Sequence, residues 1–72
     1  MDDFIGMEVI DDEGKSIGKI DGVEFDEEEA LITKVIVKLD KGIFSREKEK
    51  INYDKISKIK DVVLLKDSID ID

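Results

Sequence analysis

Cysteine, histidine, proline and glutamine are all absent from this chain of 72 residues. Without cysteine, the fold can have no disulfide and no thiolate metal site to brace it. Without histidine, it lacks the commonest general base and the commonest transition-metal ligand. We therefore expect a protein that is not an enzyme, with no catalytic residue, no resident metal and no cofactor.

Long apolar runs are missing too. No stretch approaches the roughly 20 residues that a membrane-spanning helix needs, and the N-terminus lacks the basic and apolar regions of a signal peptide. A cytoplasmic protein of one domain is the expectation. The chain is rich in lysine, glutamate and isoleucine and has one arginine and one asparagine, a bias typical of proteins from hot-growing organisms.

Charge is plentiful, and it is segregated along the chain. The net charge is −8, which disfavours nucleic acid as a default partner. Residues 1–30 carry a net charge of −10, residues 31–60 carry +5 and residues 61–72 carry −3. The basic middle therefore stands out as a candidate binding surface.

Apolar and polar residues alternate along most of the chain, which is the pattern of half-buried strands. We expect strands near residues 5–9, 16–25, 31–39, 43–53 and 62–65. The alternation is strongest between Leu31 and Leu39, where the parity that starts at Leu31 and includes Thr33 is expected to face the core and the other carries Lys34 and Lys38. The predicted core consists of Val9, Ile20, Val35, Val37, Leu39 and Leu64.

Three glycines spaced four apart accompany the first strands, and each has its own expected role. Gly14 is expected in a hairpin turn with positive φ, Gly18 at a close approach of two strands, and Gly22 in a β-bulge with Asp21. A short helical turn is predicted near residues 54–59. These elements predict an all-β fold, a small antiparallel barrel of five to six strands. The domain is expected to span residues 1–66, followed by an acidic C-terminal tail at 67–72.

The order of these features resembles the PRC-barrel family, over nearly the whole chain. The family opens with an apolar-Gly-x-x-Val strand, then an Asp-x-x-Gly loop and a Gly-Lys-apolar-x-Asp strand, and it closes with a Val-x-Leu strand. The matching segments here are residues 5–9, 11–14, 16–21, 33–37, 56–59 and 62–65. Asn52-Tyr53 stands where the family often has a proline before its helical turn.

The resemblance implies a non-catalytic role. The family includes the barrel of the photosynthetic reaction-centre H subunit, the C-terminal barrel of the ribosome maturation factor RimM, and stand-alone archaeal proteins linked to cell division. The chain is similar to the stand-alone archaeal type. This implies an adaptor that binds another protein in a division or membrane-associated assembly. The alternative is an accessory factor in ribosome or RNA maturation, and a homodimer is left open.

Two motifs suggest ligands but lack the context that such sites need. Gly14-Lys15-Ser16 has Val9 where a phosphate loop has its first glycine, and a strand is expected where the loop has a helix. The acidic run from Glu24 to Glu29 lacks the spacing of a calcium loop. We interpret the first motif as a hairpin turn and the second as a solvated turn, with cation binding by the acidic run left open.

The basic middle yields the one candidate site. Alternation places Lys34 and Lys38 on the outer side of one strand, and basic residues on one parity of the next strand. If the two faces adjoin, they form a cationic surface for an acidic protein or RNA; the alternative is cross-strand ion pairing with glutamates. RNA is disfavoured because readers of RNA usually present aromatic side chains for stacking. The predicted partner surface comprises Lys34, Lys38, Arg46, Lys48 and Lys50.

Overall fold

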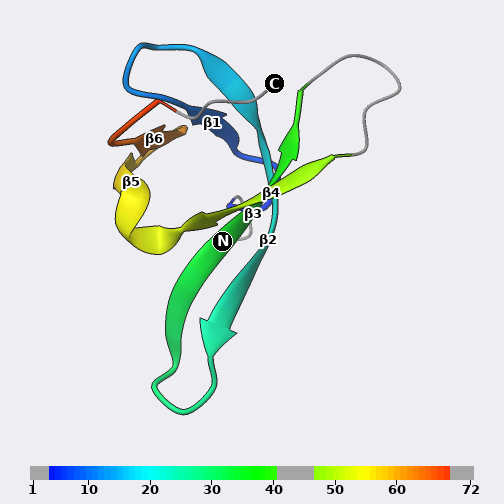
Figure 1. Ribbon diagram of the computed structural model, residues 1–72, viewed down its shortest axis with the longest axis vertical. Coiled ribbons are helices and arrows are strands. Elements are labelled where there is room, and N and C mark those ends of the chain that lie inside the picture. The colour runs from blue at the N-terminus through cyan, green and yellow to red at the C-terminus, as the bar shows by residue number, and fades with distance from the viewer. Residues whose placement is uncertain (1–3, 41–46, 69–72) are drawn as a thin grey trace.

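A single sheet of six strands organises the chain (Figure 1). The structure is a computed structural model that describes residues 4–40 and 47–68. The sheet order is β4-β3-β2-β1-β6-β5, so the all-β prediction is confirmed. The strands are β1 (Glu8–Ile10), β2 (Ser16–Asp26), β3 (Leu31–Leu39), β4 (Lys48–Asn52), β5 (Ile56–Ile59) and β6 (Val63–Leu65).

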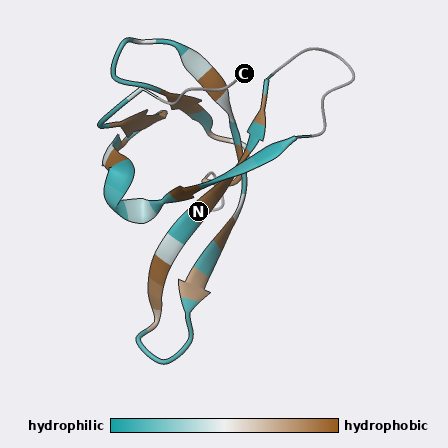
Figure 2. Ribbon diagram, in the orientation of Figure 1, coloured by the Kyte–Doolittle hydropathy of each residue, from teal (hydrophilic) through white to brown (hydrophobic). Residues whose placement is uncertain are grey.

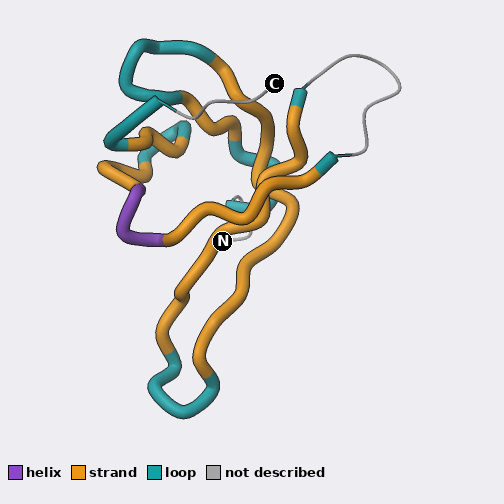
Figure 3. Tube along the Cα trace, in the orientation of Figure 1, coloured by secondary structure: helices purple, strands orange, loops and turns teal. Residues whose placement is uncertain are grey.

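The sheet curls as a barrel does, but it does not close. Its two edges are β4 and β5, and the 3-10 turn η1 (Tyr53–Lys55) joins them along the chain (Figure 3). The expected closure is therefore made by the chain itself at this point and not by a hydrogen-bonded ladder. One pairing also differs from the antiparallel expectation, because β1 and β6 run parallel, with Val9 opposite Val63.

The core lies inside the curl, where the hydropathy colouring is brown on several strands (Figure 2). Five of the six predicted core residues are buried, and Val9, Val35 and Val37 have no exposed surface at all. Leu64 was predicted wrongly: it is half-buried, and its neighbours on β6 are the buried residues. The phase was misjudged because Val-Val-Leu-Leu has no polar residue to mark the outer side. The buried cluster comprises Val9, Ile17, Ile20, Val35, Val37, Leu39, Ile51, Val63 and Leu65.

The hairpin of β2 and β3 confirms two expectations about glycine. Ile20 lies opposite Val37 and Gly22 opposite Ile36, so Asp21 is the extra residue of a β-bulge. Gly18 is buried against β3, and an added Cβ would overlap the carbonyl oxygen of Lys38. A bulged strand bends and twists more strongly than a regular one. The bulge therefore lies where the hairpin leaves the curled sheet.

Beyond the bulge, the hairpin extends as an arm away from the rest of the sheet (Figure 1). β4 pairs with β3 only between Lys34 and Lys38, so among the described residues the outer part of β3 pairs with β2 alone. Leu31 is 57% exposed and Thr33 is exposed. The expectation that both face the core is wrong, because the core ends before the strand does.

The remaining predicted boundaries shift by a few residues. β1 begins at Glu8, and Ile5 is exposed ahead of it. The helical turn is confirmed at η1, but Ile56 and Ile59 belong to the strand β5 instead of to the turn. The predicted start of the fourth strand, residues 43–46, lies outside the described residues.

The beginning of the predicted tail contacts the domain. The Asp67 carboxylate lies 3.7 Å from the Lys55 ammonium, and Ser68 donates a hydrogen bond of 2.7 Å to Asp12. These contacts attach residues 67–68 to η1 and to the first hairpin loop. A boundary at residue 66 stays a prediction.

Candidate interaction surface

The outer side of β2, β3 and β4 gathers five lysines, and we call this set the lysine face. Residues that lie directly opposite each other in a sheet project to the same side. Lys38 lies opposite Lys48, and Ile36 lies opposite Lys50. Since Val35 and Val37 point into the core, Lys34, Ile36 and Lys38 point outward, and so do the residues opposite them. The lysine face comprises Lys19, Lys34, Lys38, Lys48 and Lys50.

Three of these lysines form one row across the sheet. Lys19 on β2 lies opposite Lys38 on β3, and Lys38 lies opposite Lys48 on β4. Like charges directly opposite one another in a sheet are destabilising. The row continues on β1 with Glu8, which lies opposite Lys19. A positive row of this kind is attractive to an anion that bridges adjacent ammonium groups.

Two carboxylates on β2 neutralise part of the lysine face. The Lys48 ammonium lies 2.9 Å from an Asp21 oxygen, and the Lys50 ammonium lies 2.7 Å from a Glu24 oxygen. Asp21 follows the inward Ile20 and so projects to the outer side, where its pair with Lys48 reaches across β3, the strand between β2 and β4. Cross-strand ion pairing, the alternative to a binding surface, is therefore present at two of the five lysines.

The neighbouring lysines lower the pKa of Glu24. The hydrogen bond from Lys50 lowers the pKa of the Glu24 carboxyl below its usual value, and the positive charges of Lys50 and Lys34 lower it further, while partial desolvation opposes them. Lys34 lies opposite Glu24 in the ladder. Glu24 therefore stays ionised to lower pH than an isolated glutamate does.

The remaining lysines keep their charge available. Within residues 4–40 and 47–68, no carboxylate lies within ion-pair distance of Lys19, Lys34 or Lys38. The lysine face thus holds five positive groups against the two carboxylates that pair with it and Glu8 at the end of the row. It is a local cationic surface on a chain whose net charge is −8.

The structure brings together four of the five residues predicted for the partner surface, namely Lys34, Lys38, Lys48 and Lys50. Arg46 lies outside the described residues. The sequence analysis missed Lys19, because its place opposite Lys38 depends on the register that the bulge sets. Its position directly before Ile20, which was predicted to face the core, is the signal that would have placed Lys19 on the outer side.

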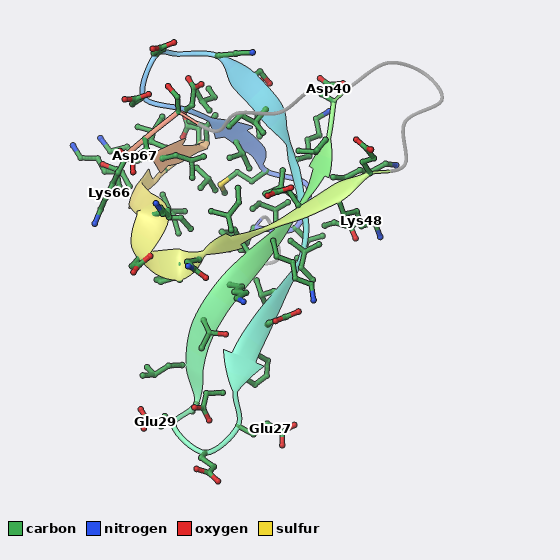
Figure 4. All side chains as sticks on the ribbon, in the orientation of Figure 1. Glu27, Glu29, Asp40, Lys48, Lys66 and Asp67 are labelled. Carbon is green, nitrogen blue, oxygen red and sulfur yellow. The ribbon has the colours of Figure 1, made fainter. Side chains whose placement is uncertain are left out.

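An acidic turn forms the far end of the arm, and we call it the acidic tip: Asp26, Glu27, Glu28 and Glu29. Figure 4 labels Glu27 and Glu29 at the end of the hairpin, far from Lys48. Asp26 organises the turn, since its side chain accepts hydrogen bonds of 2.8 Å from the Glu28 N–H and 3.4 Å from the Glu29 N–H. The three glutamates are exposed.

The tip does not gather its carboxylates around a point. No group of three or more acidic side chains among the described residues is arranged to hold a metal ion. The glutamates instead project from successive positions of a turn, where water solvates them. They present negative charge outward, which suits contact with a positive surface better than chelation.

The Gly14-Lys15-Ser16 motif is the end of a hairpin turn, as predicted. Gly14 has φ of +84°, and its N–H donates to the Asp11 carbonyl oxygen at 3.1 Å. The Asp11 side chain is buried and accepts hydrogen bonds of 2.9 Å from both Glu13 N–H and Lys15 N–H. Since the strand β2 follows at Ser16, the helix that a phosphate loop requires is not there.

Comparison with known protein families agrees with this architecture. The model of the PRC-barrel domain matches residues 1–71, and the chain belongs to the PRC-barrel family. No curated protein matches it significantly. PRC-barrel domains are general protein-interaction modules and are generally non-catalytic. No helix within the described residues is long and apolar enough to cross a bilayer.

Proposed function

We propose that this chain is a non-catalytic adaptor that binds an acidic polypeptide segment on its lysine face. The row of Lys19, Lys38 and Lys48 is the observation that carries the proposal. Three ammonium groups on adjacent strands repel one another, and an ion pair in the described chain neutralises only Lys48. A bound carboxylate would relieve that repulsion and gain charge-assisted hydrogen bonds.

Chemistry and family both favour a binding role over catalysis. The chain has no histidine and no cysteine. The lysines of the lysine face lie on the outer side of the sheet, either opposite one another or paired with carboxylates. The PRC-barrel fold is used as a protein-interaction module. The resemblance to stand-alone archaeal members supports the proposal that the adaptor acts in a cell-division or membrane-associated assembly.

The test is direct binding of a fluorescent peptide of glutamates, followed by anisotropy. Wild type should bind the peptide, and Lys38→Glu with Lys48→Glu should weaken binding at least about tenfold, because it turns attraction into repulsion at the centre of the row. Raising salt from about 0.15 M to about 1 M should also weaken it, since the screening length falls from about 8 Å to about 3 Å.

The matched control reverses the same number of charges at sites outside the lysine face. Lys58→Glu with Lys60→Glu reverses two exposed lysines that lie off the face, and the net charge becomes the same as in the first variant. Binding should remain close to that of wild type. If both double variants bind the peptide equally well, or if wild type does not bind it, the lysine face is only a solvated surface.

RNA is the second candidate, because a lysine row also suits phosphates. The arrangement of aromatic residues disfavours it. Phe25 follows Val23 by two positions on β2 and therefore lies on the opposite side of the sheet from the lysines. A single-stranded RNA in the same anisotropy assay separates the two: tighter binding of RNA than of the acidic peptide would favour the role in RNA maturation.

A further inference from the structure

We propose that the acidic segment bound by the lysine face is the acidic tip of a second copy of this chain. The inference rests on the proposed function, because it names the partner of that same face. In the dimer, two hairpin arms lie antiparallel against each other, and each tip contacts the lysine row of the other copy. The arrangement has a two-fold axis, so both contacts form at once.

The argument starts from the charge order along the outer side of the hairpin. At the base lies the row of Lys19, Lys38 and Lys48, and at the far end lies the acidic tip (Figure 4). Between them lies the pair of Lys34 and Glu24, which lie opposite each other. Lys50 also pairs with Glu24 from β4, so the outer side is positive from the row to the middle and negative at the tip.

A two-fold axis through Lys34 and Glu24 places the positive end of one copy against the negative end of the other. Lys38 lies four residues from Lys34, about 13 Å at 3.3 Å per residue. The first tip residue, Asp26, lies opposite Leu31, which is three residues from Lys34 in the other direction, about 10 Å. Lysine and glutamate side chains easily span the difference. Antiparallel overlap therefore brings each tip over the other copy's lysine row.

The same overlap covers apolar side chains that the fold leaves open. Leu31 is on the outer side, because it lies opposite Asp26, which follows the inward Phe25. It is 57% exposed. Ile36 is half-buried on the outer side, where it lies over Gly22. In the antiparallel arrangement, Leu31 of one copy meets Ile36 of the other between the two charged contacts.

A parallel arrangement is excluded by the same charges. It would set two acidic tips against each other and two lysine rows against each other, and like-charge contacts oppose association. The charge order therefore selects one orientation of the second copy. A partner of another sequence would need to reproduce the full order of tip, apolar residue and lysine row to fit equally well.

The contact is small, which sets the conditions of the test. Two strands over nine residues and β4 over the five residues that it pairs with, at about 4.8 Å between strands and about 3.3 Å per residue, span about 360 Å². This is about half of the roughly 800 Å² per partner in a stable interface. The dimer should therefore be weak and should form at protein concentrations approaching about 1 mM, in the range of weak complexes.

Sedimentation of two charge-reversal variants, alone and mixed, tests the proposal. The tip variant is Glu27→Lys, Glu28→Lys and Glu29→Lys; the row variant is Lys19→Glu, Lys38→Glu and Lys48→Glu. Each alone should be monomeric where wild type dimerises, because tip and row now have the same sign. The mixture should dimerise, because each variant's tip is then opposite in charge to the other's row.

Overall charge gives the opposite expectation for the tip variant, which makes the result decisive. Three Glu→Lys changes move the net charge from −8 to −2, so reduced general repulsion would increase self-association. Glu13→Lys, Asp54→Lys and Asp61→Lys form the matched control, with the same net charge, three exposed sites and an intact tip. The control should dimerise at least as strongly as wild type.

Three results would overturn the proposal: wild type that stays monomeric near 1 mM, a tip variant that still dimerises, or a mixture that does not. Persistent dimers of the tip variant would point instead to the other side of the arm, where Phe25 is 58% exposed opposite Ile32. The glutamate peptide separates this failure from that of the proposed function. If wild type is monomeric but binds the peptide, the lysine face remains a binding surface, and only the second copy is ruled out as its partner.

Discussion

Gly18 and Lys38 face each other so closely that β2 has no room for a side chain at this point. An added Cβ at Gly18 would overlap the Lys38 carbonyl oxygen and lie 3.0 Å from Leu39 Cα. Both obstacles are backbone, which cannot rotate away as a side-chain end can. The close approach holds the base of the hairpin together and with it the lysine row.

Gly18→Ala should therefore destabilise the protein, by about 1–3 kcal/mol, the usual cost of forcing extra volume into packed structure. Denaturant unfolding measures it. Gly22→Ala is the matched control, because its added methyl would lie 3.7 Å from the end of the Ile36 side chain, an ordinary contact. Equal losses from both substitutions would contradict the close approach.

Val37 and Leu31 test where the core ends along β3. Val37 has no exposed surface, so Val37→Ala should cost at least about 1 kcal/mol in free energy of unfolding, and more if a cavity remains. Leu31→Ala should cost less than about 0.5 kcal/mol, as is usual for exposed positions. Thermal or denaturant unfolding of the two variants compares them. A larger loss at Leu31 would mean that the arm packs against something in the isolated chain.

Asp11 supports the first hairpin loop from within. Its buried carboxylate accepts hydrogen bonds from the N–H groups of Glu13 and Lys15. Asp11→Ala removes the acceptor of two donors and should cost about 1–3 kcal/mol. Asp11→Asn keeps an oxygen in the same place and should lose less of the unfolding free energy. Similar losses for the two variants would show that the hydrogen bonds are not what stabilises the loop.

Glu24 links the lysine face to pH. Its pKa is lower in the folded state than in the unfolded chain, so the stabilisation it provides is present above the unfolded pKa and is lost as pH falls through the folded pKa. NMR titration of the Glu24 carboxyl should show a midpoint below that of an isolated glutamate. Lys50→Met should move this midpoint upward, since it removes the main cause, whereas Lys58→Met should leave it unchanged. An unshifted midpoint in wild type would contradict the ion pair.

Local pattern was enough to predict the fold because a small β domain carries its signals in short segments. Alternation between Leu31 and Leu39 identified the inward residues Val35, Val37 and Leu39. The change of apolar phase after Ile20 required an extra residue, and the bulge at Asp21 supplies it. Each signal depends on the period of two along a strand. That period can be seen in the sequence of one strand, without knowing which strands lie beside it.

The errors lie where the period carries no information. Val62-Val63-Leu64-Leu65 is apolar at every position, so either parity fits, and only packing beside β1 buries Val63 and Leu65 and leaves Leu64 half-buried. Leu31 keeps the apolar alternation of the sequence and is nevertheless exposed, because a second register shift between Glu24 and Phe25 turns it to the outer side, beyond the end of the core. Burial depends on the elements that pack against a strand, and the sequence of β3 alone does not specify them.

The sequence by itself determined that the chain is all-β, that glycines take the strained or crowded positions, and that a basic middle stands between acidic flanks. Only the tertiary structure decided which charges meet. Lys19 comes from the acidic first part of the chain, yet register places it opposite Lys38, while Lys48 pairs with Asp21 across the intervening strand β3. The physical reason is that strand pairing brings together residues far apart in the chain, and a one-residue bulge sets which of them share a row.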